Sequence, residues 1–203
     1  MTKKLSHAQF FTPNNIAKIM VGLCKNTGRF LEPACGEGVL TEALIQKHQV
    51  GWVSGVSIEL DQTVAPDYAK VMDFFEYPTA EKFPTVISNP PYLSHKAIPE
   101  STRSTERFKM LEARLGGLAN LYAYFILKSF LHIEQSGEMV FIVPEECFRT
   151  TSNFKLFDFL HRHGTITDVV KFKKTPFNEV SQDVLIFRYE KDNFSYQTNV
   201  EVV

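Results

Sequence analysis

The chain has 203 residues, of which 44% are hydrophobic, enough for one domain with a sizeable core. Its formal net charge is −1, so it lacks the strong basic excess that is typical of proteins that bind nucleic acid without a partner. The start lacks the apolar run of a signal peptide and no stretch approaches a membrane span, so a cytoplasmic protein is expected. Three scattered cysteines show no metal-ligand spacing, which predicts reduced thiols and no metal site.

The order of the predicted elements is typical of an α/β protein. Short apolar runs alternate with segments of helical spacing, which indicates βαβ units and a mainly parallel sheet. In the first half of the chain we expect, in order, a helix over 14–24, a strand over 28–34, a helix from 39, and strands over 52–60, 69–73 and 85–88. The last strand must end at the following prolines, because proline cannot donate to a strand ladder.

The second half begins with a polar excursion over 93–118, where Pro99 and the Gly116-Gly117 pair predict an irregular segment with a short helix. After it we expect a helix from 120 to about 135, a strand over 138–143, a helix over 153–163, and strands over 165–172 and 184–189 joined by a turn at 175–179. The predicted fold is an α/β domain over 1–190, with a mainly parallel seven-stranded sheet and helices on both faces. The polar tail over 191–203 is expected to begin a linker.

Four segments of chemical interest follow predicted strands, where ligands bind in open α/β sheets. The first is Glu32-Pro33-Ala34-Cys35-Gly36-Glu37-Gly38. Its glycines allow a ligand to approach the backbone, and the helix that follows presents unpaired N–H groups. The segment lacks the dinucleotide glycine pattern and the phosphate-loop lysine. Its acid at the strand end suits an amino-bearing ligand, although an ordinary strand-to-helix turn has the same pattern.

The next two segments each place a carboxylate after a strand. Glu59 can accept both ribose hydroxyls of an adenosine-containing ligand, with Asp61 as the nearby alternative. Asp73 can accept a hydrogen bond from the exocyclic amine of a purine, while the ring of Phe74 stacks on it. Each pattern is also typical of a solvated acid that lies beside a core residue and binds no ligand.

The fourth segment is Asn89-Pro90-Pro91-Tyr92. The amine of a purine is a poor nucleophile, because its lone pair is delocalised into the ring. An Asn carbonyl and an adjacent backbone carbonyl can accept its two N–H groups and localise that lone pair for attack on a methyl group. The prolines keep these acceptors preorganised, and Tyr92 offers a ring on which the target base can stack.

With these motifs in this order, the chain resembles the gamma-type N6-adenine DNA methyltransferases of the class I Rossmann-like fold. The resemblance includes Ala8–Pro13 as the N-terminal motif and Asn120–Phe125 as the helix motif, with Tyr122 and Phe125 in the core. It implies S-adenosylmethionine as the cofactor. The cofactor residues that it implies are Phe11, Thr12, Glu32, Pro33, Ala34, Cys35, Gly36, Glu59, Leu60, Asp73, Phe74 and Asn89. It also implies catalysis by Asn89, Pro90, Pro91 and Tyr92, and base stacking by Tyr92 and Phe177, with Phe172 as a competitor for the latter.

The resemblance implies DNA as the partner, with specificity from a C-terminal recognition domain that this chain lacks or from a partner subunit. The basic side chains of 93–118 and of Lys171, Lys173 and Lys174 either meet phosphates or are solvated. Two alternatives remain open. The same fold could methylate a protein glutamine amide or RNA, or the chain could be a silent scaffold subunit of a restriction-modification complex.

Overall fold

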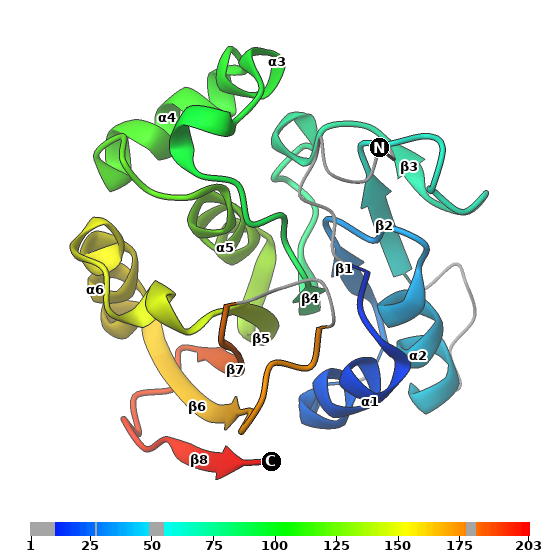
Figure 1. The fold of residues 1–203 in the computed structure, drawn as a ribbon, viewed down its shortest axis with the longest axis vertical. Helices are drawn as coiled ribbons and strands as arrows, with labels where there is room; N and C mark the ends of the chain where they lie inside the picture. Colours follow the sequence, from blue (N-terminus) through cyan, green and yellow to red (C-terminus); the bar gives the residue numbers. More distant parts are fainter. Residues whose placement is uncertain (1–10, 27, 49–54, 178–181) are drawn as a thin grey trace.

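A single mixed sheet organises the part of the chain that the computed structural model describes, namely residues 11–26, 28–48, 55–177 and 182–203. The strands follow the order β3-β2-β1-β4-β5-β7-β6-β8 (Figure 1). Their bounds are β1 Phe30–Glu32, β2 Gly55–Glu59, β3 Lys70–Val71, β4 Phe83–Ser88, β5 Ile133–Pro144, β6 Gly164–Lys171, β7 Val184–Lys191 and β8 Asn199–Val202. Neighbouring strands are parallel, except that β7 is antiparallel to both β5 and β6.

Helices cover both faces of this sheet. Helices α1 (Asn14–Leu23) and α2 (Val39–His48) lie together on one side, and α4 (Glu106–Leu115), α5 (Leu121–His132) and α6 (Phe154–His163) lie on the other (Figure 1). Shorter helical turns are η3 Phe74–Glu76, η4 His95–Ala97, α3 Glu100–Arg103, η5 Glu145–Phe148 and η6 Thr151–Asn153. The predicted α/β class with helices on both faces is confirmed.

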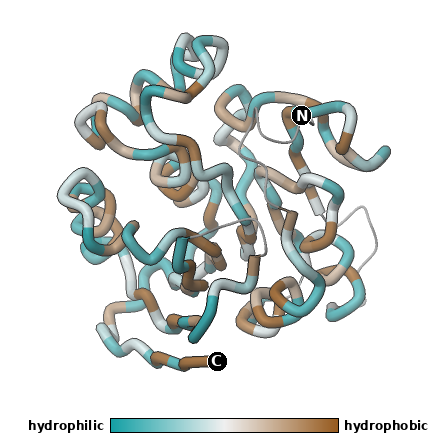
Figure 2. Tube along the Cα trace, in the orientation of Figure 1, coloured by the Kyte–Doolittle hydropathy of each residue, from teal (hydrophilic) through white to brown (hydrophobic). Residues whose placement is uncertain are grey.

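The two apolar cores follow from the alternation of side chains along the central strands. In β5, Val140 and Ile142 pack in the core beneath α1 and α2, whereas Met139, Phe141 and Val143 pack in the core beneath α5. Figure 2 shows apolar residues recurring along these interior strands. Helix α5 is apolar on nearly every side, which is expected of a helix that is buried all round.

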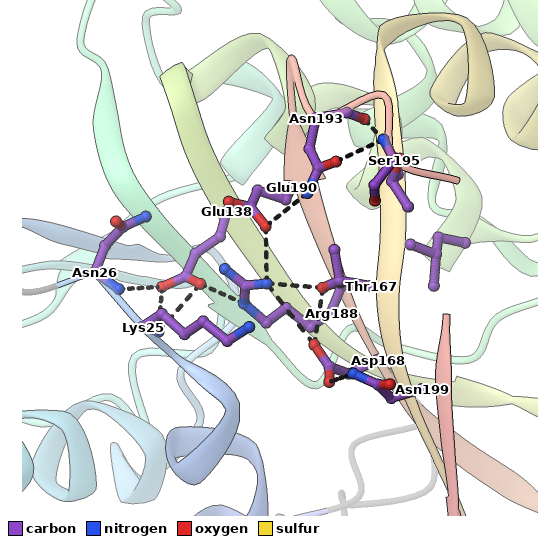
Figure 3. A network of polar contacts seen from close by, with 12 residues as sticks. Lys25, Asn26, Glu138, Thr167, Asp168, Arg188, Glu190, Asn193, Ser195 and Asn199 are labelled. Atoms are coloured by element: carbon purple, nitrogen blue, oxygen red, sulfur yellow. Dashed lines mark hydrogen bonds and ion pairs between the residues drawn. The ribbon is translucent and has the colours of Figure 1, made fainter. Parts of the chain in front are cut away.

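A buried polar network ties the middle of β5 to β7, β6 and the segment after α1 (Figure 3). Arg188 Nε donates to Glu138 Oε2 over 2.6 Å, and both side chains are almost completely buried. Glu138 also accepts from the backbone N–H groups of Lys25 and Asn26, at 2.9 and 2.8 Å to Oε1. Arg188 Nη1 reaches Thr167 Oγ1 over 2.7 Å. The network therefore satisfies a buried ion pair and anchors the C-terminal end of α1.

Three expectations about the elements were wrong. The sheet has eight strands in the described residues, not seven, because 199–202 of the expected linker pair with β6 as β8. Helix α5 ends at His132 rather than near 135, because Ile133 is buried and pairs with Phe83 of β4. The excursion over 93–118 is largely helical and packed. Residues 52–54 of the predicted second strand and 178–179 of the predicted turn lie outside the described residues.

Candidate active site

A cavity opens where β1, β2, β3 and β4 end, at the edge that the parallel strands share. The empty space between its walls is about 820 Å³, open solvent at the mouth included. All four predicted strand-end segments contribute to its wall. The predicted residues that line it are Phe11, Pro33, Ala34, Gly36, Glu59, Leu60, Asp73, Phe74, Asn89, Pro90 and Pro91.

The loop after β1 is held against Glu59 at the end of β2. Glu59 Oε2 accepts from the backbone N–H of Gly36 over 2.8 Å, and Oε1 accepts from that of Asp61 over 2.9 Å. Gly36 and Gly38 have φ values of 53° and 89°, in the left-handed region that favours glycine. A Cβ on Gly38 would lie 1.9 Å from the hydroxyl of Tyr68. Both glycines are therefore favoured by conformation, and Gly38 is also required by space.

The segment after β3 forms another wall. Asp73 precedes the short helix η3, and its Oδ1 accepts from the N–H of Phe75 over 2.8 Å. Beneath it, the fully buried Lys128 of α5 donates from Nζ to the carbonyl oxygens of Phe74 and Tyr77. The same ammonium lies 4.4 Å from the centroid of the Phe74 ring. Burial lowers the pKa of Lys128 to about 7.

The segment after β4 places Asn89, Pro90 and Pro91 in the wall. Asn89 Nδ2 donates to Thr12 Oγ1 over 3.2 Å, which joins this loop to the residues before α1. The hydroxyl of Tyr92 donates to the carbonyl oxygen of Ile142 over 3.1 Å. The loop is thereby fixed at both ends.

Five predicted site residues do not line the cavity. Thr12 accepts a hydrogen bond from Asn89, which lines the cavity, whereas Cys35 is a buried residue of the loop after β1. Tyr92 packs against both apolar cores, whereas Phe177 is buried in the core that contains α1 and α2. The two rings predicted to stack on a base therefore share one of these cores. Their role in stacking stays a prediction, as do the roles of the other site residues. Ala8 to Phe10 of the N-terminal motif lie outside the described residues.

Glu32 is the fifth of these residues and lies almost wholly inside the protein. Thr41 Oγ1 donates to its Oε2, and Thr41 Oγ1 lies 2.6 Å from Ser57 Oγ. Burial raises the pKa of the Glu32 carboxyl to about 8. The raised pKa favours the uncharged form of this buried side chain, which joins the end of β1 to α2 and, through Thr41, to β2.

Sequence reasoning missed several residues of the wall. They are Met72, Phe75, Leu93, Pro99, Thr102, Leu121 and Phe125. Leu121 and Phe125 belong to the helix motif, whose apolar residues were expected only in the core. Leu93, Pro99 and Thr102 come from the polar excursion, in which no local pattern indicated a contact with the site.

Among the described residues, no three His, Cys, Asp or Glu side chains are grouped so as to hold a metal ion. Among the helices of the same residues, none is long and apolar enough to span a membrane.

The chain is similar to restriction-modification methylases. A model of the Eco57I restriction-modification methylase family matches residues 42–177. Type II methyltransferase M.HincII of Haemophilus influenzae is 32% identical over 195 residues, which are 94% of this chain and 38% of that protein. M.TthHB8I of Thermus thermophilus is 32% identical over 187 residues, 87% of this chain and 44% of the relative. The chain thus spans less than half the length of these curated relatives.

Solved structures confirm the fold. The methyltransferase subunit of a type I restriction-modification system from Streptococcus thermophilus superposes with a TM-score of 0.73 at 19% identity, over 95% of this chain and 47% of the other. A Listeria monocytogenes protein of the class I S-adenosylmethionine-dependent methyltransferase fold gives 0.70 at 19% identity, over 100% and 67%. These likenesses confirm the class I methyltransferase fold, and the sequence relatives confirm the family resemblance.

Proposed function

We propose that this chain, which belongs to the Eco57I restriction-modification methylase family, transfers a methyl group from S-adenosylmethionine to N6 of a flipped-out adenine in DNA. The observation that carries this proposal is the position of Asn89-Pro90-Pro91 in the wall of a cavity that also holds the carboxylates of Glu59 and Asp73. The curated relatives, named as type II methyltransferases, support it.

The chemistry of the wall fits S-adenosylmethionine. Phe11, Leu60 and Phe125 offer apolar surface for an adenine ring, and Glu59 and Asp73 offer acceptors for ribose hydroxyls and an exocyclic amine. These acceptors match an adenosine-containing ligand better than a phosphate, which two carboxylates would repel. When bound, the cofactor supplies a methyl group activated by a sulfonium.

Asn89 supplies the acceptor for the target amine. Its Oδ1 is the side-chain atom that can accept from the N–H of the amine, and the bond from Nδ2 to Thr12 Oγ1 fixes the direction in which Oδ1 faces. A bound sulfonium would supply the methyl group, and the localised lone pair of the amine would accept it. The surplus proton would then pass from the amine to solvent, which leaves N6-methyladenine and the thioether. Acceptors held in place before the reaction contribute most where charge develops.

Product analysis tests the proposal. The chain is incubated at low salt with isotopically labelled S-adenosylmethionine and, in separate reactions, single-stranded DNA, RNA and a glutamine-containing peptide. Single-stranded DNA avoids the cost of flipping a paired base. The expected product is N6-methyladenine in DNA, identified by mass spectrometry and lost in Asn89→Ala. Label in RNA or peptide alone would assign another substrate, and no transfer to any of them would favour a scaffold role.

We further propose that target recognition comes from a recognition domain or a partner subunit, and that the complete enzyme serves a restriction-modification system. The net charge of −1 supports this, because phosphate neutralisation supplies much of the affinity for DNA. The exposed Lys173 and Lys174 after β6 are the candidates for local phosphate contacts, whereas the ammonium of Lys171 pairs with Glu145 over 3.0 Å.

A further inference from the structure

The excursion over 93–118 is a packed part of the cavity wall. Phe108 of α4 is fully buried and meets the ring of Phe75 edge-to-face, with centroids 5.1 Å apart. Ile98 and Leu111 are buried in the same core. Since Phe75 itself lines the cavity, α4 is held directly against the wall. The segment therefore belongs to the ligand site and does not lie free over it.

Thr102 of α3 connects the excursion to the carboxylate of Asp73. Its side chain lines the cavity and is only 4% exposed. Thr102 Oγ1 donates to Asp73 Oδ2 over 2.5 Å, while Asp73 Oδ1 accepts from the N–H of Phe75 over 2.8 Å. Each oxygen of this carboxylate is thus held by one donor, and the plane of the carboxylate is fixed relative to the cavity.

We propose that Thr102 is a positioning residue that orients Asp73 to recognise the exocyclic amine of the cofactor's adenine. The proposal rests on the proposed function, because it takes S-adenosylmethionine as the ligand. A carboxylate oxygen has two lone-pair directions, so Oδ2 can accept from Thr102 and from an amine at once. A base that carries a carbonyl in place of the amine would present an acceptor to an acceptor. The Thr102–Asp73 pair therefore selects adenine over hypoxanthine.

Equilibrium binding of two product analogues tests this without any methyl transfer. The ligands are S-adenosylhomocysteine and its counterpart in which hypoxanthine replaces adenine. Calorimetry gives both Kd values for the wild-type chain, Thr102→Val, Thr102→Ser and Ser104→Ala. Ser104 is the matched control, because its exposed hydroxyl on the same segment bonds only to the carbonyl of Ser101 among the contacts described. Urea unfolding of each variant checks that it is folded.

The expected result is a change in ligand preference. Thr102→Val should weaken binding of the adenine ligand by about 5- to 10-fold, the scale of one lost hydrogen bond, and should lower the preference over hypoxanthine. Thr102→Ser should restore both values, and Ser104→Ala should leave them unchanged. Should the valine variant not fold, Thr102→Ala applies the same test, because it also removes the hydroxyl that donates to Asp73 Oδ2.

Two outcomes would overturn the proposal. If Thr102→Val weakens the binding of both ligands equally, Thr102 has only a structural role. If it weakens the binding of neither, Thr102 has no role at the site. If the wild-type chain binds neither ligand at millimolar concentration, the cofactor assignment itself fails and this proposal fails with it. The ratio of the two Kd values thus tests the inference, whereas wild-type binding tests the function on which it rests.

Discussion

The side-chain amide of Asn89 is oriented by Thr12, although the two residues are 77 positions apart in the chain. The Nδ2–Oγ1 distance is 3.2 Å, and the bond connects the loop after β4 to the segment that leads into α1. An asparagine amide has one donor end and one acceptor end, so a partner for the donor end decides where the acceptor faces. The N-terminal segment thereby contributes to the geometry of the proposed catalytic acceptor.

Removing the hydroxyl of Thr12 should lower turnover more than cofactor affinity. We expect Thr12→Val to reduce kcat roughly 10-fold and Asn89→Ala roughly 100-fold or more, because a preorganised acceptor is lost. The double variant should be no slower than Asn89→Ala, since Thr12 acts through Asn89. Single-turnover methylation of DNA measures these rates. Multiplicative losses would show that the two residues act independently.

Glu59 should determine affinity for the cofactor. In Glu59→Gln one acceptor oxygen becomes an NH₂ group that faces a backbone N–H, either that of Gly36 or that of Asp61. We expect the Kd for S-adenosylmethionine to rise by roughly 10-fold or more, the scale of a hydrogen bond to a charged group. The exposed Glu37 of the same loop is the control, and Glu37→Gln should bind normally. Unchanged calorimetric affinity in Glu59→Gln would exclude Glu59 from the cofactor site.

Duplex DNA should be a poor substrate for this chain by itself. A paired adenine must be flipped at a cost of a few kcal/mol, and a net charge of −1 gives little attraction toward phosphates. Methylation of duplex DNA at physiological salt should therefore be slow and independent of sequence, and a longer or partnered form should be faster and site-specific. Efficient, specific methylation by residues 1–203 would contradict this prediction.

Lys128 should make stability depend on pH. Burial lowers its pKa to about 7, against 10.5 in the unfolded chain, so between these values the unfolded state binds more protons. The free energy of unfolding should therefore rise with pH over that range, by on the order of a few kcal/mol. Urea unfolding from pH 6.5 to 10 measures the slope, and Lys128→Met should remove this contribution. Equal slopes in both proteins would contradict a lowered pKa.

Breaking the ion pair between Arg188 and Glu138 should destabilise the whole domain. Arg188→Met leaves the Glu138 carboxylate buried without its partner, which typically costs about 3–5 kcal/mol. Adding Glu138→Gln should recover part of that loss, because the buried charge is removed while an acceptor for Lys25 and Asn26 remains. Denaturant unfolding of the single and double variants measures the coupling. Additive losses would show that the pair is not energetically linked.

The amino-acid sequence by itself determined the α/β class, the order of the strands along the chain and the segments that carry the site. These features depend on local patterns. An apolar run followed by glycine or proline marks the end of a strand, and parallel strands bring such ends to one edge. For this reason Gly36, Glu59, Asp73 and Asn89 were found from the sequence and line one cavity.

Only the tertiary structure decided which distant residues support these predicted residues of the cavity. The bonds from Asn89 to Thr12 and from Thr102 to Asp73 join segments that no periodicity relates. Lys128 interrupts an apolar helix as an exposed residue would, yet it is fully buried because the carbonyls of Phe74 and Tyr77 accept from it. Which side chains of distant segments come into contact depends on how the elements pack in three dimensions. The spacing of residues along the chain does not predict that packing.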